Sequence, residues 1–122
     1  MRVSIDDTDI APNQQVLYKG EPFTGTAVEY GRDGRVIAEA DYRNGIHDGR
    51  SRDYYPDGQI EAEYWFKFGM GHGTSRLWYP NGQLKEEKEV DNGRVVSKRC
   101  WAEDGTPLDP DTGQPLDQGP AG

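Results

Sequence analysis

The chain has 122 residues, of which 33% are hydrophobic and 30% charged, and its formal net charge is −8. This composition is too polar for a thick two-layer core, yet 11% aromatic residues is too many for a disordered chain, so we expect one thin, elongated domain. The acidic total also argues against nucleic acid and membrane as the main partners, because DNA, RNA and anionic lipids favour clusters of Lys and Arg.

The first 15 residues are expected to form a capping segment. Residues 2–5 read as one short strand that covers an open sheet edge. Met1–Ile10 carries three aspartates and has no apolar run typical of a signal peptide. The single Cys100 cannot form an intramolecular disulfide. Together these features favour a cytoplasmic location.

Residues 16–102 carry glycines that recur about every 24 residues, in two interleaved series. Such a period is typical of a repeat architecture, in which one small unit must stack on copies of itself to bury its apolar face. Asn-Gly pairs such as Asn44-Gly45 favour tight hairpin turns, because both residues tolerate positive φ. No interval between turns is long enough for a stable helix. The sequence therefore predicts an all-β fold, a single elongated antiparallel sheet of tandem β-hairpin repeats, with strands near residues 26–30, 35–42, 49–55, 59–66, 73–79, 83–90 and 94–101.

Strand alternation predicts that the two faces of this sheet differ. Each hairpin pairs an aromatic with an aliphatic residue: Tyr30 with Val36, Tyr54 with Ile60 and Trp78 with Leu84. These six are expected to share an apolar core face with Val28, Ala38, Ala40, Tyr42, Ala62, Tyr64, Phe66 and Val90, and with an ion pair of Arg76 and Glu86. The other face is expected to be acidic and to carry Glu29, Glu39, Asp41, Asp53, Glu61, Glu63, Glu87, Glu89, Trp65, Leu77 and Tyr79.

The glycine and aromatic spacing resembles the MORN-repeat-variant family. One copy runs from Gly45 through Gly49, Tyr54 and Gly58 to Ile60, and the next from Gly69 to Leu84. An earlier copy starts at Gly20 with one extra residue, and a partial copy starts at Gly93. Chains made mostly of such repeats resemble the bacterial antitoxin group of the family, which includes immunity proteins that neutralise a toxin encoded beside them. The resemblance supplies no catalytic residue.

A partner-binding site is expected on the acidic face, around Trp65. Exposed aromatic residues among charges are typical interface anchors; alternatively, Trp65 closes the sheet against a loop or a terminal segment. The acidic residues could attract a basic partner or could simply be solvated. Tyr55 and Tyr79 could extend the interface, although packing against the adjacent hairpin is favoured. The full candidate set is Trp65, Asp53, Glu61, Glu63, Glu87, Tyr55, Leu77 and Tyr79.

The remaining polar residues predict neither a metal site nor a catalytic site. His47 and His72 lack Cys or carboxylate partners at metal-binding spacing. Cys100 lacks the signature of a nucleophile, so no cofactor is expected. Residues 103–122 form an acidic tail rich in Pro and Gly, whose composition is typical of disorder, although Leu108 and Leu116 could anchor it.

These observations favour a non-enzymatic antitoxin or immunity protein. It would bind a cognate protein toxin as a heterodimer and cover the active or substrate-binding surface of that toxin. The alternative is a MORN-type scaffold or a module that binds membrane surfaces, and an enzyme ranks third. Substitution of Trp65 by Ala is expected to weaken the complex without unfolding the chain.

Overall fold

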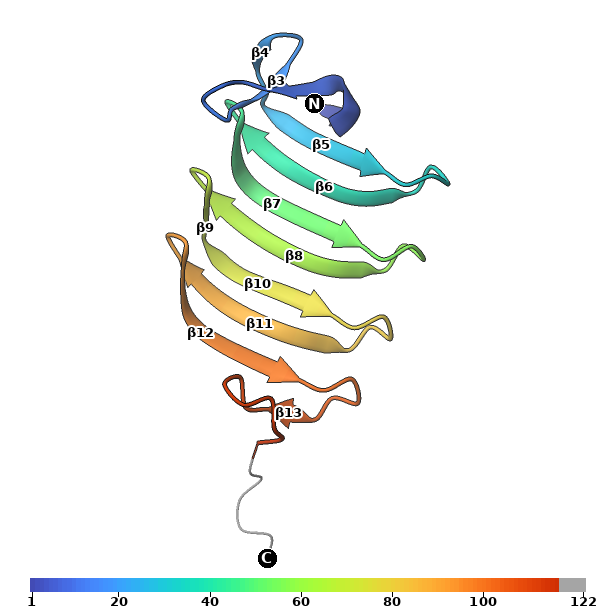
Figure 1. Cartoon of the computed structure of the whole chain (residues 1–122), viewed down its shortest axis with the longest axis vertical. Coiled ribbons are helices and arrows are strands. Elements are labelled where there is room, and N and C mark those ends of the chain that lie inside the picture. The colour runs from blue at the N-terminus through green and yellow to red at the C-terminus, as the bar shows by residue number, and fades with distance from the viewer. Residues whose placement is uncertain (117–122) are drawn as a thin grey trace, which may run out of the picture.

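The computed structural model describes residues 1–116, which form almost only β-strands (Figure 1). Near the N-terminus lie β1 (Arg2–Ser4), a short 3-10 turn η1 (Ile5–Asp7), β2 (Thr8–Ile10), β3 (Val16–Tyr18) and β4 (Glu21–Pro22). The repeats follow as β5 (Gly25–Tyr30), β6 (Val36–Arg43), β7 (Ile46–Tyr54), β8 (Ile60–Lys67), β9 (Met70–Gly71), β10 (Gly73–Trp78), β11 (Leu84–Asp91) and β12 (Arg94–Trp101), and then β13 (Pro107–Leu108).

The predicted elongated sheet is confirmed. Its strands lie in the order β1-β5-β6-β7-β8-β10-β11-β12-β13, and each repeat strand pairs antiparallel with its neighbour in the chain (Figure 1). The N-terminal strand caps the array as expected, because β1 pairs with β5, in parallel. Strands β2, β3 and β4 form a second, small sheet, and the expected domain boundary after residue 15 falls inside it.

The hairpin turns have the backbone conformation that their sequences indicate. Asn44 and Gly45 have φ values of 50° and 77°, so both central residues of this turn are left-handed, as tight hairpin turns that match strand twist require. A side chain would also not fit at Gly45, since an added Cβ would lie 2.7 Å from the carbonyl oxygen of Val16.

The expected division of side chains between the two faces is wrong in part, because each hairpin has a β-bulge beside its turn. In the second hairpin Tyr54 lies opposite Ile60 as predicted, but Asp53 lies opposite Ala62, so Glu61 is an extra residue. Side chains alternate along a strand, and Tyr54 therefore lies on the face opposite to Ala62. Ile37 and Lys85 are the extra residues of the other two hairpins.

The predicted core face is thus split between the two sides of the sheet. The hairpin aromatics Tyr30, Tyr54 and Trp78 share one side with Val28, which lies opposite Glu39. The other side carries Ala38, Ala40, Tyr42, Ala62, Tyr64, Phe66 and Val90. The most buried cluster lies at the N-terminal end, where Val3, Phe23 and Ala27 pack together.

The tail expected to be disordered is partly ordered. β13 pairs with Cys100 and Trp101 of β12, and Leu108 also bridges to Pro115. Residues 117–122 of the expected acidic tail lie outside the described residues.

Candidate functional site

One face of the sheet carries a row of alternating acids and bases, and we call it the ladder face. Each member lies opposite the next on the neighbouring strand, in the order Glu39, Arg52, Glu63, Arg76, Glu87 and Arg99. Arg52 Nε lies 2.7 Å from Glu63 Oε2, and Arg76 Nε lies 2.9 Å from Glu87 Oε2. Opposite charges on directly opposed residues stabilise a sheet.

This row overturns the expected acidic face. The acids recur every 24 residues and each is matched by an arginine, so charge along the row is compensated. The expected pair of Arg76 and Glu86 is also wrong, because the bulge at Lys85 places Arg76 opposite Glu87. Hydrogen bonds from Arg99 and Arg76 lower the pKa of Glu87. A hydrogen bond from Tyr54 and the charge of Arg2 lower the pKa of Glu39, although burial opposes them.

Trp65 lies on the ladder face, as expected, but its surroundings differ from the expected acidic ones. It lies opposite Arg50 and is 39% exposed. A shallow cleft beside it is also lined by Arg43, Lys67 and Arg76. A basic partner would therefore meet bases around this tryptophan, so Trp65 does not form the anchor of an acidic docking surface.

The other predicted site residues are not brought together. Glu63 and Glu87 are held in the ladder by arginines, and Glu61 is the exposed extra residue of a bulge. Tyr55 and Tyr79 donate hydrogen bonds to backbone carbonyls of the next hairpin, which agrees with the packing alternative. A separate correction concerns Asp53 and Leu77, which lie on the opposite side of the sheet from Trp65, each opposite Ala62.

The side of the sheet that carries Ala62 contains a stack of aromatic rings that ends at a gap. Tyr18, Phe23, Tyr42, His47 and Phe66 follow one another with ring centroids 4.5 to 6.1 Å apart. His47 lies opposite Tyr42, and the equivalent pairs in the next repeats are Phe66 with Gly71 and Val90 with Val95. Gly71 thus stands where the repeat before it has a ring.

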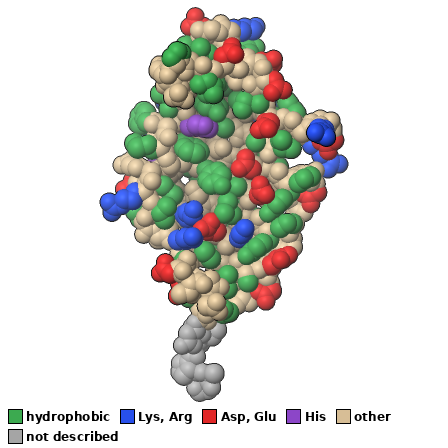
Figure 2. All heavy atoms as spheres, in the orientation of Figure 1, with side chains coloured by type: hydrophobic (Ala, Val, Ile, Leu, Met, Phe, Trp, Pro, Cys, Tyr) green, Lys and Arg blue, Asp and Glu red, His purple; other side chains and the backbone are tan. Residues whose placement is uncertain are grey.

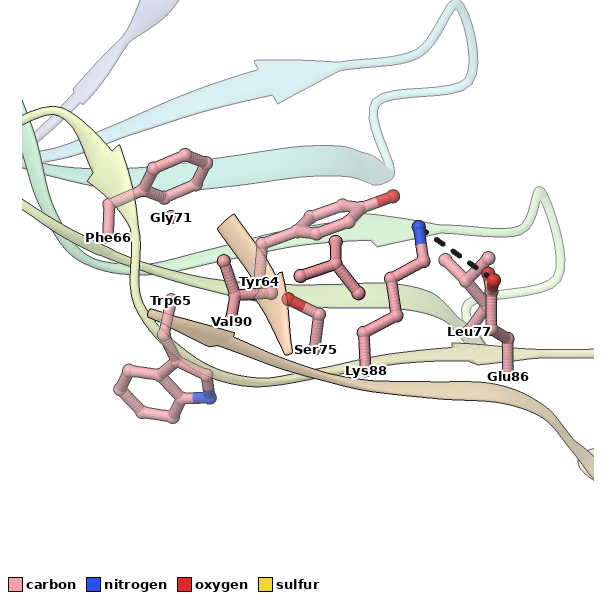
Figure 3. Close-up of a pocket in the computed structure, with 10 residues that line it drawn as sticks. Tyr64, Trp65, Phe66, Gly71, Ser75, Leu77, Glu86, Lys88 and Val90 are labelled. Atoms are coloured by element: carbon pink, nitrogen blue, oxygen red, sulfur yellow. Dashed lines mark ion pairs between the residues drawn. The ribbon is translucent and has the colours of Figure 1, made fainter. Parts of the chain in front are cut away.

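The missing side chain at Gly71 leaves a hollow of about 190 Å³, and we call this side the hollow face. The apolar walls of the hollow are Tyr64, Phe66, Leu77, Val90 and Val95. Figure 3 shows Tyr64, Phe66 and Val90 on one side of the strands, whereas the indole of Trp65 points away on the other. The bulges are what place Leu77 here, next to Tyr64.

Polar groups line one end of the hollow. Ser75 lies opposite Lys88, and Lys88 lies opposite Lys98. Both lysines approach the Oε1 atom of Glu86, at 3.8 Å and 3.0 Å. Figure 3 shows the Tyr64 hydroxyl and the Lys88 ammonium reaching toward the same end. In the space-filling view, hydrophobic side chains form a band along the visible face, and Lys and Arg side chains surround an acidic one below its middle (Figure 2).

Sequence reasoning missed this hollow, although the spacing contains its signal. Phe23, His47, Gly71 and Val95 follow one another at intervals of 24 residues, so a glycine in that series predicts a missing ring. Reading Gly71 only as a turn residue concealed it.

Comparison with protein families now accounts for the repeat. Residues 48–67 and 71–92 match the family described as MORN repeat variant. The chain contains MORN-variant repeats. The two matches cover β7 with β8 and most of β9 to β11, so the hollow lies on matched repeats, and a MORN array of this kind is a repeat scaffold. The copy starting at Gly20 and the partial copy starting at Gly93 fall outside the matches. No curated protein matches the chain. Within residues 1–116 there is no helix long and apolar enough to cross a membrane.

Proposed function

We propose that this MORN-variant array is a non-enzymatic binding protein of the bacterial antitoxin or immunity kind. It holds a cognate protein toxin against the hollow face and covers the active or substrate-binding surface of that toxin. The single observation that carries the proposal is the open apolar hollow at Gly71, on an array whose other face is closed by ion pairs.

Exposed apolar side chains beside the hollow extend this surface to the edge of the sheet. Phe68, Met70, Val95 and Val96 are 71%, 46%, 51% and 56% exposed. They lie on or next to the turns that contain Gly69 and Gly93. Contiguous exposed apolar residues are typical of protein–protein interfaces, so this edge supports docking of a protein surface larger than the hollow itself.

Growth rescue tests the proposal. The protein encoded by the adjacent gene is expressed in a bacterial host, alone or together with the array. We expect growth arrest by the neighbour alone and recovery when the array is present. Val95→Glu, which places a carboxylate at the hollow, should abolish recovery. Ile10→Glu is the matched control, because Ile10 is equally aliphatic, 70% exposed and remote in the small sheet. A harmless neighbour, or rescue by Val95→Glu, would contradict the proposal.

A second candidate function is a scaffold at a membrane surface. The observation in its favour is that Arg43, Lys67 and Arg94 flank the exposed Phe68 and Met70 on the same turn edge. Basic residues beside apolar ones favour anionic lipid surfaces. This candidate predicts binding to phosphatidylglycerol vesicles that is abolished by salt, and it fails if the protein does not sediment with such vesicles at low salt.

A further inference from the structure

We propose that the hollow receives an apolar side chain of a partner protein that carries a carboxylate two residues away in an extended segment. This inference rests on the proposed binding function, and it adds the chemistry that the partner must present.

The apolar part of the inference follows from the walls of the hollow. Phe66, Val90 and Val95 surround the position of the missing ring, and Leu77 and the Tyr64 ring close the side. An engineered apolar cavity of about 150 Å³ binds benzene, so a hollow of about 190 Å³ is large enough for one aromatic or leucine side chain. An apolar occupant would continue the stack that runs from Tyr18 to Phe66.

The carboxylate follows from the row of hydrogen-bond donors beside those walls. Tyr64, Ser75, Lys88 and Lys98 lie on four neighbouring strands, β8, β10, β11 and β12. Within residues 1–116 the hydroxyls of Tyr64 and Ser75 have no protein partner. A carboxylate is an acceptor that could take hydrogen bonds from several such donors.

Charge at this end of the hollow points the same way. Lys88 and Lys98 lie directly opposite each other, an arrangement that is unfavourable for like charges. Glu86 is the one carboxylate that pairs with both of them in the described part of the chain. Two cations therefore share one anion, and a second carboxylate supplied by the partner would balance them. Asp53, which lies beyond Ala62 on the far side of Leu77, would in contrast repel an anion placed there.

The spacing between the two parts is set by the strands. Val90 of the apolar wall and Lys88 of the donor row are two residues apart on β11, which is about 7 Å along a strand. Residues i and i+2 of an extended segment lie on one face at the same spacing. A partner segment laid along β11 would thus place an apolar side chain in the hollow and an acidic one at the lysines.

Matched capped pentapeptides test this inference on the full-length protein. Acetyl-Gly-Phe-Thr-Glu-Gly-amide and acetyl-Gly-Phe-Thr-Lys-Gly-amide differ in one charged residue. Each is titrated while the methyl NMR signals of Leu77, Val90 and Val95 are followed. We expect the acidic peptide to shift these signals with an affinity at least about fivefold higher than that of the basic peptide, since each tenfold corresponds to about 1.4 kcal/mol. Lys88→Met should reduce this preference.

Controls make the test decisive. Gly71→Val fills the hollow and should abolish the shifts, whereas Ser97→Val, an equal change on the opposite face of β12, should leave them unchanged. Equal affinity for the two peptides, or no shift with either, would overturn the inference. Shifts with free 3-phenylpropanoate but with neither peptide would also overturn it, because the hollow would then be a small-molecule site. Selective peptide binding without growth rescue would support the inference and reject the antitoxin proposal.

Discussion

The Tyr55 hydroxyl donates a 2.5 Å hydrogen bond to the backbone carbonyl oxygen of Trp78, in the next hairpin of the array. One repeat later the Tyr79 hydroxyl donates to the carbonyl oxygen of Trp101 over 2.8 Å. These bonds fasten each hairpin tip to its successor. The repeats are therefore coupled at the tips as well as through their strands, as expected where stability comes from contacts between neighbouring repeats.

Removing either hydroxyl should weaken this coupling. We expect Tyr55→Phe and Tyr79→Phe each to lower the free energy of unfolding by about 0.5–1.5 kcal/mol, because each leaves a backbone carbonyl without its partner. Tyr30→Phe is the matched control, since the Tyr30 hydroxyl has no hydrogen bond within the described residues and Tyr30 is 50% exposed. Urea unfolding followed by tryptophan fluorescence measures all three. Equal effects for Tyr30 and Tyr55 would contradict the role of the tip bonds.

The ion-pair ladder should make the array sensitive to acid. Hydrogen bonds from Arg99 and Arg76 hold the pKa of Glu87 below its ordinary value of 4.5. The unfolded chain then binds a proton more readily than the folded one, so the stabilisation is complete above pH 4.5 and is lost as the pH falls through the lowered pKa. We expect Glu87→Gln to flatten the loss of stability below pH 4.5 in urea unfolding. Glu29→Gln, which removes a carboxylate without an ion pair in the described chain, should leave that slope unchanged.

His47 should act in a different pH range. Burial between Tyr42 and Phe66 lowers the pKa of His47 below 6.5, and its Nδ1 atom has no partner in the described structure. The unfolded state takes up the proton first, so stability should fall as the pH drops below about 6.5 and level off below the lowered pKa. His47→Phe should remove this dependence and raise the free energy of unfolding at pH 6, because it relieves a buried unsatisfied nitrogen.

The exposed His72 provides the control for this prediction. Its ring lies 3.6 Å from Asp91 and is 44% exposed. We expect His72→Phe to leave the pH dependence of the His47 transition in place. An unchanged slope in the His47→Phe variant would show that the ring stack tolerates a charged imidazole.

The sequence was sufficient for the repeats, the turns and the pairing of Tyr54 with Ile60, because glycine and Asn-Gly signals carry the period. The two faces were partly misassigned, because strict alternation assumes that no residue is inserted between the turn and the strand. Glu61 breaks that assumption, and a bulge has no residue type that distinguishes it from an ordinary strand position. The regular spacing of Arg52 and Arg76 against the glutamates was the one available sign.

The candidate site depended on the same point. With Leu77 placed on the wrong face, Tyr64 and Leu77 could not be seen as two walls of one hollow. Gly71 added to the difficulty, since a glycine near a turn is usually interpreted by its backbone and seldom by the side chain that it lacks. In this chain Gly71 has a backbone conformation open to other residues, so its role is to leave space.

Gly71→Val therefore tests the central claim most directly, with growth rescue and urea unfolding measured on the same variant. An added Cβ would lie 3.2 Å from Val90 Cγ1, a contact that needs only a small shift, and valine suits a strand better than glycine. We expect the free energy of unfolding to stay within about 1 kcal/mol or to rise, while neutralisation of the neighbouring toxin is lost. A stable Gly71→Val protein that still restores growth as well as the original chain would contradict the claim that partners dock at this hollow.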